Sequence, residues 1–390
     1  MECLWTKSFI GLTLSMFFLC LGFYLLLPTL PLYLKNLGLG ESQLGFIIGS
    51  FTLTAVIVRP FIGGLLDRFG RRYFVIAGLI LFAIAMVLYN WASGIFMLIL
   101  LRILHGSGWA ISSTSIGTAI TDIIPARRQS EGMGWYGIST SVSMAIGPVL
   151  GVWMIQIYSF RHVIVLASCL SVAAILIALV TKVPAIRSEN KRRVVFFDKS
   201  ILPISASILF LSLTYGGITT FLPLFAGSIQ VNAGTFFLVY AVALTVTRPV
   251  AGRLADRYNE GTIIILSMIL AIIALLILSL SDGLMGILVS AILYGIGFGS
   301  ALPTLQAATL RLVSPVHKGM ANASFLTALD LGIGLGSILL GFISQRFGYP
   351  VLFASCAVSG FIAVLIFIGF VRRTLLHGKE EHIGNIHQSS

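Results

Sequence analysis

Two places in the sequence set ionisable side chains inside long apolar segments, where charge is costly. Asp330 is the one acidic residue that we expect deep within such a segment, because the others fall in loops, in tails or at segment ends. Arg102 lies about seven residues inside another apolar segment, and His105 follows three residues later. Residues three apart lie within about 60° of each other on a helix, so Arg102 and His105 would share a face. These three groups are the candidates for proton chemistry.

Each of these groups has a structural alternative. A carboxyl at low dielectric can exchange a proton for an ion-pair partner, which makes Asp330 the first candidate, although a permanent ion pair with Arg59 is also open. Arg102 could extend to the surface instead of facing the interior. His105 could be a titrating group or a neutral, hydrogen-bonded residue. The sequence alone does not choose between these alternatives.

The composition indicates what surrounds these groups. Of 390 residues, 57% are hydrophobic and 10% are charged, and the mean hydropathy is +1.02. Soluble domains are nearer half apolar and a quarter charged. Apolar stretches of about 20 residues can cross a hydrocarbon core roughly 30 Å thick. We therefore predict an all-α, multi-pass protein in a lipid bilayer and exclude an ordinary soluble enzyme.

Twelve apolar stretches are bounded by charges or turn residues. The loops on one side would carry only Lys35, Arg161 and Arg346, which makes that side external and puts both termini in the cytoplasm. The net charge of +12 therefore reflects orientation in a cell membrane and not nucleic-acid binding. The predicted spans lie at approximately 9–33, 43–66, 73–92, 95–120, 132–156, 162–182, 201–226, 233–254, 262–280, 284–310, 320–344 and 350–371.

A charged connection divides the spans into two sets of six. We predict an N-terminal bundle at 1–183, a cytoplasmic linker at 184–200, a C-terminal bundle at 201–373 and a cytoplasmic tail at 374–390. The tail is polar and its histidines are spread out, so we expect a disordered end and no metal site. The four cysteines show no CxxC spacing, so neither a disulfide framework nor a zinc site is expected. No cofactor is expected.

The two halves of the chain repeat. RPFIGGLLDR, which begins at Arg59, returns 189 residues later as RPVAGRLADR, and ILHGSG, which begins at Ile103, returns at the same offset as ILYGIG. Six spans per copy give both copies the same orientation, related by an axis along the membrane normal. We therefore expect two pseudo-symmetric lobes with a central cavity whose access alternates between the two sides. The counterparts of Asp330 and Arg102 are uncharged, so these charges are not part of the repeat.

The first copy of the repeat continues into a turn rich in glycine and arginine. Its charges lie where the chain must turn at the cytoplasmic surface, and its glycines permit close backbone approach. We expect Asp67 to pair with a neighbouring arginine and latch the cytoplasmic side in one state, with Asp122 as a further partner. The alternative is that these charges only set the topology. The predicted cytoplasmic gate comprises Gly63, Asp67, Arg68, Arg71, Arg72, Asp122, Asp256 and Arg257.

A stripe of small residues marks the predicted span at 132–156. Ser139, Ser143, Gly147 and Gly151 follow one another at every fourth position, and Pro148 removes one backbone hydrogen bond. We expect a kinked, tightly packed interface between the halves, with ordinary helix packing as the alternative. Six aromatic residues are candidates for lining the cavity, although most aromatics of such a chain must face lipid or core: Tyr24, Trp109, Tyr136, Tyr215, Tyr240 and Tyr294.

These motifs resemble those of the major facilitator superfamily. The loop from Gly63 to Arg72 is similar to the family's signature loop in every position, and RILHGSG from Arg102 resembles its span-4 motif, with His105 where glutamine is usual. The stretch from Ser143 to Val152 resembles the span-5 motif of its proton-coupled exporters, with Ser and Val replacing the flanking glycines. The resemblance covers essentially the whole chain. It implies a twelve-helix secondary transporter of the drug:proton antiporter branch.

The sequence therefore predicts a monomeric secondary active transporter. The first hypothesis is a proton-coupled exporter of a small amphipathic drug or metabolite, which would act in multidrug resistance. The alternative is a proton-coupled uptake symporter for a small metabolite, such as an anion attracted by Arg102. An enzyme is not expected, because Ser107 lies about 200° around the helix from His105, which therefore cannot serve as its base. The sequence also lacks the nucleotide-binding pattern GxxxxGK[ST].

Overall fold

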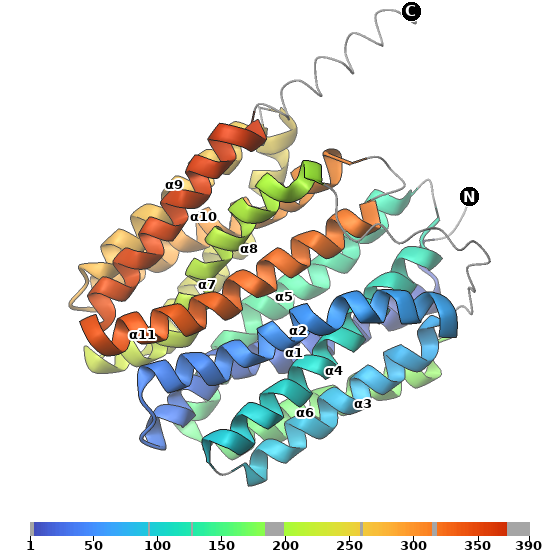
Figure 1. Ribbon diagram of the computed structural model, residues 1–390, viewed down its shortest axis with the longest axis horizontal. Coiled ribbons are helices and arrows are strands. Elements are labelled where there is room, and N and C mark those ends of the chain that lie inside the picture. The colour runs from blue at the N-terminus through green and yellow to red at the C-terminus, as the bar shows by residue number, and fades with distance from the viewer. Residues whose placement is uncertain are drawn as a thin grey trace, which may run out of the picture. The chain divides into compact units, whose positions relative to one another are not determined.

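The computed structural model describes residues 4–92, 94–125, 128–183, 199–257, 260–313 and 318–372. Within these ranges all regular structure is helical, as predicted (Figure 1). The chain divides into two compact units. Unit 1 comprises Met1–Val194 with Leu222–Leu224, and unit 2 comprises Val195–Phe221 with Phe225–Ser390.

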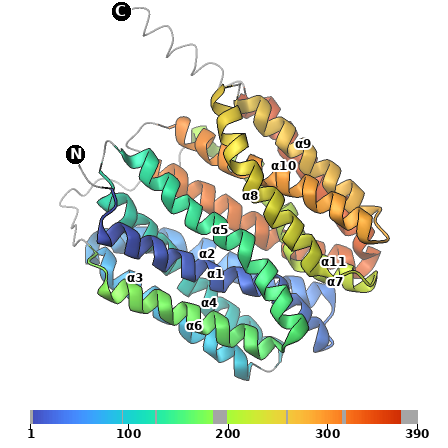
Figure 2. The ribbon, with the colours of Figure 1, turned by 180° about the vertical axis from the view of Figure 1, so that it is seen from behind.

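Unit 1 contains six long apolar helices. Helix α4 packs against α2 and α3, and α1 packs against α5 and α6 (Figure 2). Thr6 caps the first helix by accepting a hydrogen bond from the Phe9 amide at 3.1 Å. The helices are α1 (Lys7–Asn36), α2 (Glu41–Phe69), α3 (Arg71–Leu88), α4 (Ile95–Ile123), α5 (Gln129–Ile157) and α6 (Phe160–Val180), with a 3₁₀ turn at Tyr89–Trp91 after α3.

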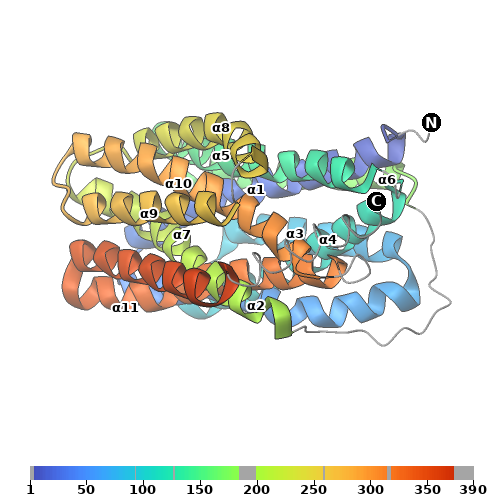
Figure 3. The ribbon, with the colours of Figure 1, turned by 90° about the horizontal axis from the view of Figure 1, so that it is seen from above.

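Unit 2 is built in the same way. Helix α10 packs against both α8 and α9, and α11 packs against α9 (Figure 3). The helices are α7 (Leu202–Ser228), α8 (Ala233–Arg257), α9 (Glu260–Ser279), α10 (Leu284–Arg311) and α11 (Lys318–Ile366), followed by a π-helical turn at Phe367–Val371. Helices α9 and α10 begin 189 residues after α3 and α4, which is the offset of the sequence repeat.

Element α11 contains both stretches that the sequence analysis predicted as separate spans. Its two helical arms meet at Gly348, whose non-helical φ of 81° is accessible to glycine at little cost. By length and composition, ten helices of the described chain are able to cross a membrane, against the twelve spans predicted. The difference has two sources, since α11 counts once and the apolar part of α8, Ala233–Thr247, is shorter than the others.

Glycines let α4 and α10 approach their neighbours closely. A Cβ added at Gly108 would lie 2.6 Å from the amide nitrogen of Phe82 in α3, and one added at Gly106 would meet the carbonyl of Phe51 in α2. In unit 2, a Cβ added at Gly297 would lie 2.6 Å from the amide nitrogen of Ala271. The repeated GxG pattern is therefore a packing device, because only glycine leaves room for the adjacent backbone.

Five hydroxyl groups of α4 donate hydrogen bonds within their own helix. Each donates to the carbonyl four residues earlier, at distances between 2.6 and 2.9 Å. Such bonds satisfy a hydroxyl in an apolar setting without a neighbouring helix. The residues are Ser112, Ser113, Ser115, Thr118 and Thr121.

Candidate functional site

Arg102 is buried inside unit 1. It is 1% exposed, and its guanidinium carbon lies 5.4 Å from the ring centroid of Phe51 and 6.0 Å from that of Tyr89. An aromatic ring attracts a cation at this range. Across the described residues, no acidic side chain forms an ion pair with Arg102, and its Nε and Nη2 have no hydrogen-bond partner. The guanidinium therefore does not extend to the surface and is held by aromatic rings.

His105 lies in the same aromatic surroundings. Its ring centroid is 4.3 Å from that of Phe82, 4.9 Å from that of Phe51 and 5.8 Å from that of Tyr89. It is completely buried, and neither ring nitrogen has a hydrogen-bond partner within the described part of the chain. The hydrogen-bonded alternative is therefore not what this structure shows. Arg102 and His105 do share a face of α4, since both contact Phe51 and Tyr89.

Trp109 completes this cluster one turn further along α4. It stacks on Phe23 of α1 with ring centroids 4.5 Å apart. Phe23 in turn stacks on Phe51 at 4.9 Å. The cluster therefore draws on α1, α2, α4, the C-terminal half of α3 and the 3₁₀ turn that follows it. We refer to Phe23, Phe51, Phe82, Tyr89, His105 and Trp109 as the unit 1 aromatic cluster.

Unit 2 contains a corresponding cluster of tyrosines. Phe298 stacks on Tyr215 at 4.9 Å and on Tyr294 at 5.3 Å, and Tyr240 lies 6.0 Å from Tyr294. The Tyr294 hydroxyl shares a hydrogen bond of 2.8 Å with the Thr214 hydroxyl. All three tyrosines are almost fully buried. That these tyrosines line the substrate cavity therefore stays a prediction.

The two clusters occupy corresponding positions of the repeat. Unit 1 has an ionisable imidazole where unit 2 has a phenol, and a guanidinium where unit 2 has a methyl group. The same packing thus carries different chemistry in the two units. The pairs, each separated by 189 residues, are Phe51 with Tyr240, Arg102 with Ala291, His105 with Tyr294, and Trp109 with Phe298.

The small-residue stripe of α5 packs on α1, a helix of the same unit, and a part in an interface between the halves stays a prediction. The Ser143 hydroxyl donates to the carbonyl of Phe17 at 2.9 Å. A Cβ added at Gly147 would lie 2.5 Å from Cβ of Tyr24, and Gly151 approaches the next turn of α1. A small-residue stripe indicates a close helix neighbour without saying which one. Here the neighbour belongs to the same unit.

Two further predicted residues lie within or beside this packing. Pro148 lies inside α5 and has no backbone N–H, so one hydrogen bond of that helix is missing, as the sequence analysis expected. Tyr136 is half-buried, and its hydroxyl lies 3.5 Å from the position of a Cβ added at Gly117 of α4. That Tyr24 and Tyr136 line a cavity stays a prediction.

Asp330 lies in α11 and is 8% exposed. Helix α11 packs closely on α7 here, since Cβ atoms added at Gly332 and Gly336 would meet the carbonyls of Leu209 and Leu213. Among the acidic side chains that the structure describes, Asp330 is the only one inside a helix rather than at a helix end or in a loop. The fold therefore places one carboxyl in the interior of an apolar, membrane-length element.

Charged residues of unit 1 form an ion pair at the helix ends that the sequence predicts to be cytoplasmic. Arg71 Nε lies 2.7 Å from Asp122 Oδ2, which joins the start of α3 to the end of α4. Arg71 also donates to the Leu66 carbonyl at 3.5 Å, and Arg72 donates to the Leu179 carbonyl of α6 at 3.4 Å. Asp122 therefore meets Arg71, one of the arginines that the sequence analysis offered as its partners. The other predicted gate residues lie outside the described side chains: Gly63, Asp67, Arg68, Asp256 and Arg257.

Unit 2 has a matching ion pair that the sequence analysis missed. Arg311 Nη1 lies 2.8 Å from Glu260 Oε2, which joins the end of α10 to the start of α9. These residues stand 189 positions after Asp122 and Arg71. The repeat offset was therefore the signal that could have found them.

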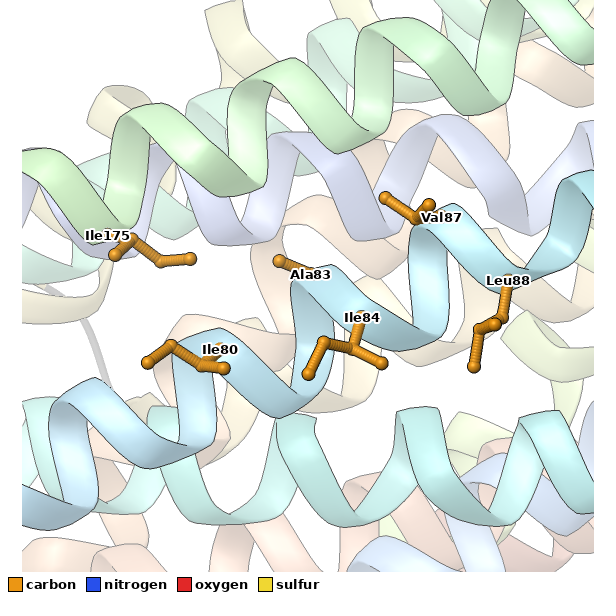
Figure 4. Close-up of a pocket in the computed structure, with 6 residues that line it drawn as sticks. All are labelled: Ile80, Ala83, Ile84, Val87, Leu88 and Ile175. Atoms are coloured by element: carbon orange, nitrogen blue, oxygen red, sulfur yellow. The ribbon is translucent and has the colours of Figure 1, made fainter.

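A surface groove lies between α3 and α6 of unit 1. It has a volume of about 300 Å³ and is lined by aliphatic side chains alone, five from α3 and one from α6 (Figure 4). Without a polar group it cannot orient a polar solute, so we do not consider it the candidate site. Its lining residues are Ile80, Ala83, Ile84, Val87, Leu88 and Ile175.

The described residues offer no obvious metal centre. They contain no group of three or more His, Cys, Asp or Glu side chains able to hold a metal ion. Cys20, Cys169 and Cys356 are free thiols. The tail histidines lie outside the described range. The candidate functional groups are therefore the buried charges of α4 and α11.

Comparison with known proteins identifies the family. The sequence profile of the Major Facilitator Superfamily matches residues 12–239 and 228–385. The chain belongs to the major facilitator superfamily. This membership makes it a multi-pass membrane transporter rather than an enzyme, with small-molecule substrates bound within the membrane.

Relatives and solved structures agree with this assignment. A staphylopine export protein of Staphylococcus aureus is 25% identical, with 88% of this chain and 90% of that protein covered. Quinolone resistance protein NorA of the same species is 25% identical, with 92% and 96% covered. The nucleoside transporter NupG (D323A mutant) superposes with a TM-score of 0.75 at 16% identity, with 93% and 99% covered. The human organic anion transporter MFSD10 gives 0.69 at 15% identity, with 92% and 98% covered.

Proposed function

We propose that this transporter is a proton-coupled exporter of a small amphipathic compound, a drug or a metabolite. The observation that carries the proposal is the position of Asp330, a carboxyl inside an apolar helix. Such a group is stable in an apolar interior when it is neutral or when a cation pairs with it. Binding a proton and binding a cationic or zwitterionic solute are therefore alternatives at Asp330, as an antiporter requires.

Export is favoured over uptake by the relatives and by one motif. A relative that aligns over most of its length is named for staphylopine export, and another is named for quinolone resistance. The α5 residues Ser143, Gly147, Pro148 and Gly151 resemble the antiporter-type motif of the family. The proposal includes a role in multidrug resistance.

The proposed architecture is a monomer of twelve spans in the cell membrane, with both termini in the cytoplasm. The two arms of α11 on either side of Gly348, together with the full length of α8, would supply the two spans beyond the ten apolar helices. Two six-helix bundles at 1–183 and 201–373 would alternate access to a central cavity, joined by the linker at 184–200 and followed by the tail at 374–390.

Unit 1 would contribute a second group of coupling residues. Arg102 and His105 lie in one aromatic cluster without an acidic partner among the described side chains. A guanidinium beside an imidazole disfavours a second positive charge there. We propose that His105 gains a proton only when Arg102 acquires an anionic partner during the cycle.

The uptake alternative rests on the same arginine. A buried guanidinium is a strong ligand for a carboxylate, so Arg102 favours an anionic solute if the aromatic cluster opens to the cavity. Some structural neighbours are described as a nucleoside transporter and an organic anion transporter. This alternative predicts that protons and solute move in the same direction.

Transport in oriented vesicles tests the proposal. Inside-out vesicles with an acid interior should accumulate candidate cationic and zwitterionic solutes while releasing protons, and Asp330→Asn should abolish the proton dependence. Asp282→Asn is the matched control, since Asp282 is an exposed loop residue. Proton-driven accumulation that persists unchanged in Asp330→Asn would overturn the assignment of Asp330. Accumulation only in right-side-out vesicles with an inward proton gradient would establish uptake instead.

A further inference from the structure

Three side chains bring unpaired hydrogen-bonding atoms together in the interior of unit 1. Arg102 is 1% exposed, Tyr89 is 2% exposed and His105 is 0% exposed. In the described part of the chain, no hydrogen-bond partner meets Nε or Nη2 of Arg102, either ring nitrogen of His105, or the Tyr89 hydroxyl. Buried polar atoms are almost always paired, so these atoms require an explanation.

The three side chains are neighbours. The guanidinium carbon of Arg102 lies 6.0 Å from the ring centroid of Tyr89, and the ring centroid of His105 lies 5.8 Å from the same ring. Phe51 contacts both, at 5.4 Å from the guanidinium carbon and 4.9 Å from the imidazole centroid. The unpaired atoms therefore belong to one group, built by α4 and by the 3₁₀ turn after α3.

This group is rich in donors and carries positive charge. Nε and Nη2 of Arg102 bear three N–H bonds, and the guanidinium is always charged. A neutral imidazole adds a further N–H bond. Among the described side chains, the ion pairs do not include Arg102. A water molecule would satisfy some of these donors but leave the charge uncompensated in an apolar interior, whereas an anion would do both.

The corresponding position in unit 2 has a different solution. Tyr294 stands where unit 1 has His105, and its hydroxyl shares a hydrogen bond of 2.8 Å with the Thr214 hydroxyl. Ala291 stands where unit 1 has Arg102 and carries no charge. The unpaired cation of unit 1 is therefore not a product of the repeated packing.

The surroundings favour a small, singly charged anion. Arg102 is the eighth residue of α4, so it lies about 10 Å along the helix from its first residue. Tyr89 begins the 3₁₀ turn whose next two residues are exposed. An ion from the adjacent water would therefore cross a short distance. Because the cost of removing water rises steeply with charge, a monovalent anion reaches such a site more easily than sulfate or phosphate.

We propose that Arg102, His105 and Tyr89 form a binding site for one small monovalent inorganic anion of the class of chloride. Arg102 supplies the charge, while the imidazole N–H and the phenol O–H supply further hydrogen bonds. The proposal names an anionic partner for the coupling role of Arg102, and in that respect it rests on the proposed function. Anion binding itself requires no transport, so the two can be tested separately.

Thermal unfolding in detergent, at fixed pH and ionic strength, tests the site. The wild-type protein should melt a few degrees higher in sodium chloride than in sodium 2-(N-morpholino)ethanesulfonate, whose anion is bulky, because a ligand of the folded state stabilises it. Arg102→Met should melt at the same temperature in both salts, and Tyr89→Phe should weaken the apparent chloride affinity several-fold. Arg161→Met is the matched control and should keep the full shift, since Arg161 is exposed in the first turn of α6.

Three outcomes of this experiment would overturn the site. The first is a wild-type melting temperature that is equal in the two salts. The second is a chloride shift that persists in Arg102→Met, since it would then be a general effect of the salt. The third is a rise with sodium acetate but not with sodium chloride, which would assign the site to a carboxylate instead of an inorganic anion.

Iodide quenching of tryptophan fluorescence gives a direct measurement. Trp109 is 7% exposed and lies in the unit 1 aromatic cluster one turn from His105. The tryptophans to be replaced by phenylalanine are all exposed: Trp5, Trp91, Trp135 and Trp153. Iodide should then quench Trp109 in a saturable manner, chloride should compete with it, and Arg102→Met should remove the saturable part.

The two measurements support each other. Quenching that does not saturate and does not change in Arg102→Met would overturn the site. If the protein with a single tryptophan fails to fold, the melting experiment still decides, because it uses the full set of tryptophans. A protein that binds the halide but transports no solute would contradict the proposed function and leave the anion site standing.

Discussion

Replacing Arg102 by methionine should stabilise the protein while abolishing transport. Arg102 is a buried cation whose described neighbours are aromatic rings rather than acids. Methionine has a similar length and no charge, so it can fill the same space between Phe51 and Tyr89. Arg102→Met therefore removes the cost of burying charge and keeps the packing. Proton-driven accumulation should be lost, because the cation is proposed to act in coupling.

The size of the gain follows from two opposing contributions. A charged side chain in the middle of a membrane helix costs about 2.5–3.5 kcal/mol on insertion scales. The two ring contacts, at 5.4 and 6.0 Å, lie near the outer limit of cation–π attraction and together return about 1–2 kcal/mol. The difference predicts that Arg102→Met stabilises the folded protein by about 0.5–2.5 kcal/mol. The melting temperature should rise by a few degrees, on the order expected for a protein of this size.

Thermal unfolding in detergent, followed by light scattering or intrinsic fluorescence, measures this shift. Arg161→Met is the matched control, because Arg161 lies exposed in the first turn of α6 and should change neither stability nor transport. A fall of several degrees in Arg102→Met would refute the reasoning, since it would mean that Arg102 is fully compensated by partners. Unchanged transport would separately refute its role in coupling.

Three other substitutions test the packing described above, each by thermal unfolding in detergent. Gly108→Ala should destabilise the protein by about 1–3 kcal/mol, because its Cβ would lie 2.6 Å from the backbone of α3. The control Gly137→Ala in α5 should be neutral or stabilising, because nothing lies within 4 Å of its Cβ. Equal losses of stability in the two variants would contradict the predicted close packing. Thr214→Val should cost about 0.5–1.5 kcal/mol by removing the hydrogen bond to Tyr294, and a double-mutant cycle with Tyr294→Phe that showed no coupling energy would argue against it. Gly348→Ala should cost about 1–2 kcal/mol because its φ of 81° is unfavourable for alanine, and a wild-type melting temperature would show that the kink does not need glycine.

Much of the fold was predictable because membrane spans leave a strong signal. Apolar length and turn residues located the helices to within a few residues, and the repeat indicated how the chain divides. The predicted spans at 320–344 and 350–371 correspond to the two arms of α11, which meet at Gly348 without a loop between them.

The sequence predicted which charged residues are buried, but not which side chains surround them. Helical spacing placed Arg102 and His105 on one face, and the structure places both against the same rings. That Phe51 and Tyr89 supply those rings depends on tertiary packing between three segments, which a single helix pattern does not contain. The proton role of this pair and of Asp330 stays a prediction.

The partners of small residues and of charges were harder to predict. The α5 stripe indicated a close neighbour, yet its actual neighbour, α1, could not be chosen from spacing alone. The Glu260–Arg311 pair was within reach, because both residues follow from Arg71 and Asp122 by the repeat offset. It was missed because the opposite polarity hides the correspondence when residue types rather than positions are compared.

The hydrogen bonds that five hydroxyl groups of α4 make within their own helix have a consequence for motion. Since its serine and threonine hydroxyls donate to carbonyls of the same helix, a slide or a rotation of α4 leaves every one of those bonds intact. The resistance to such a displacement then comes from the contacts of α4 with other helices: the close packing at Gly106 and Gly108, the Arg71–Asp122 ion pair, and the contact of Thr121 with Met133 of α5. A displacement of α4 would carry Arg102 and His105 with it while these hydroxyl groups stay bonded to their own helix.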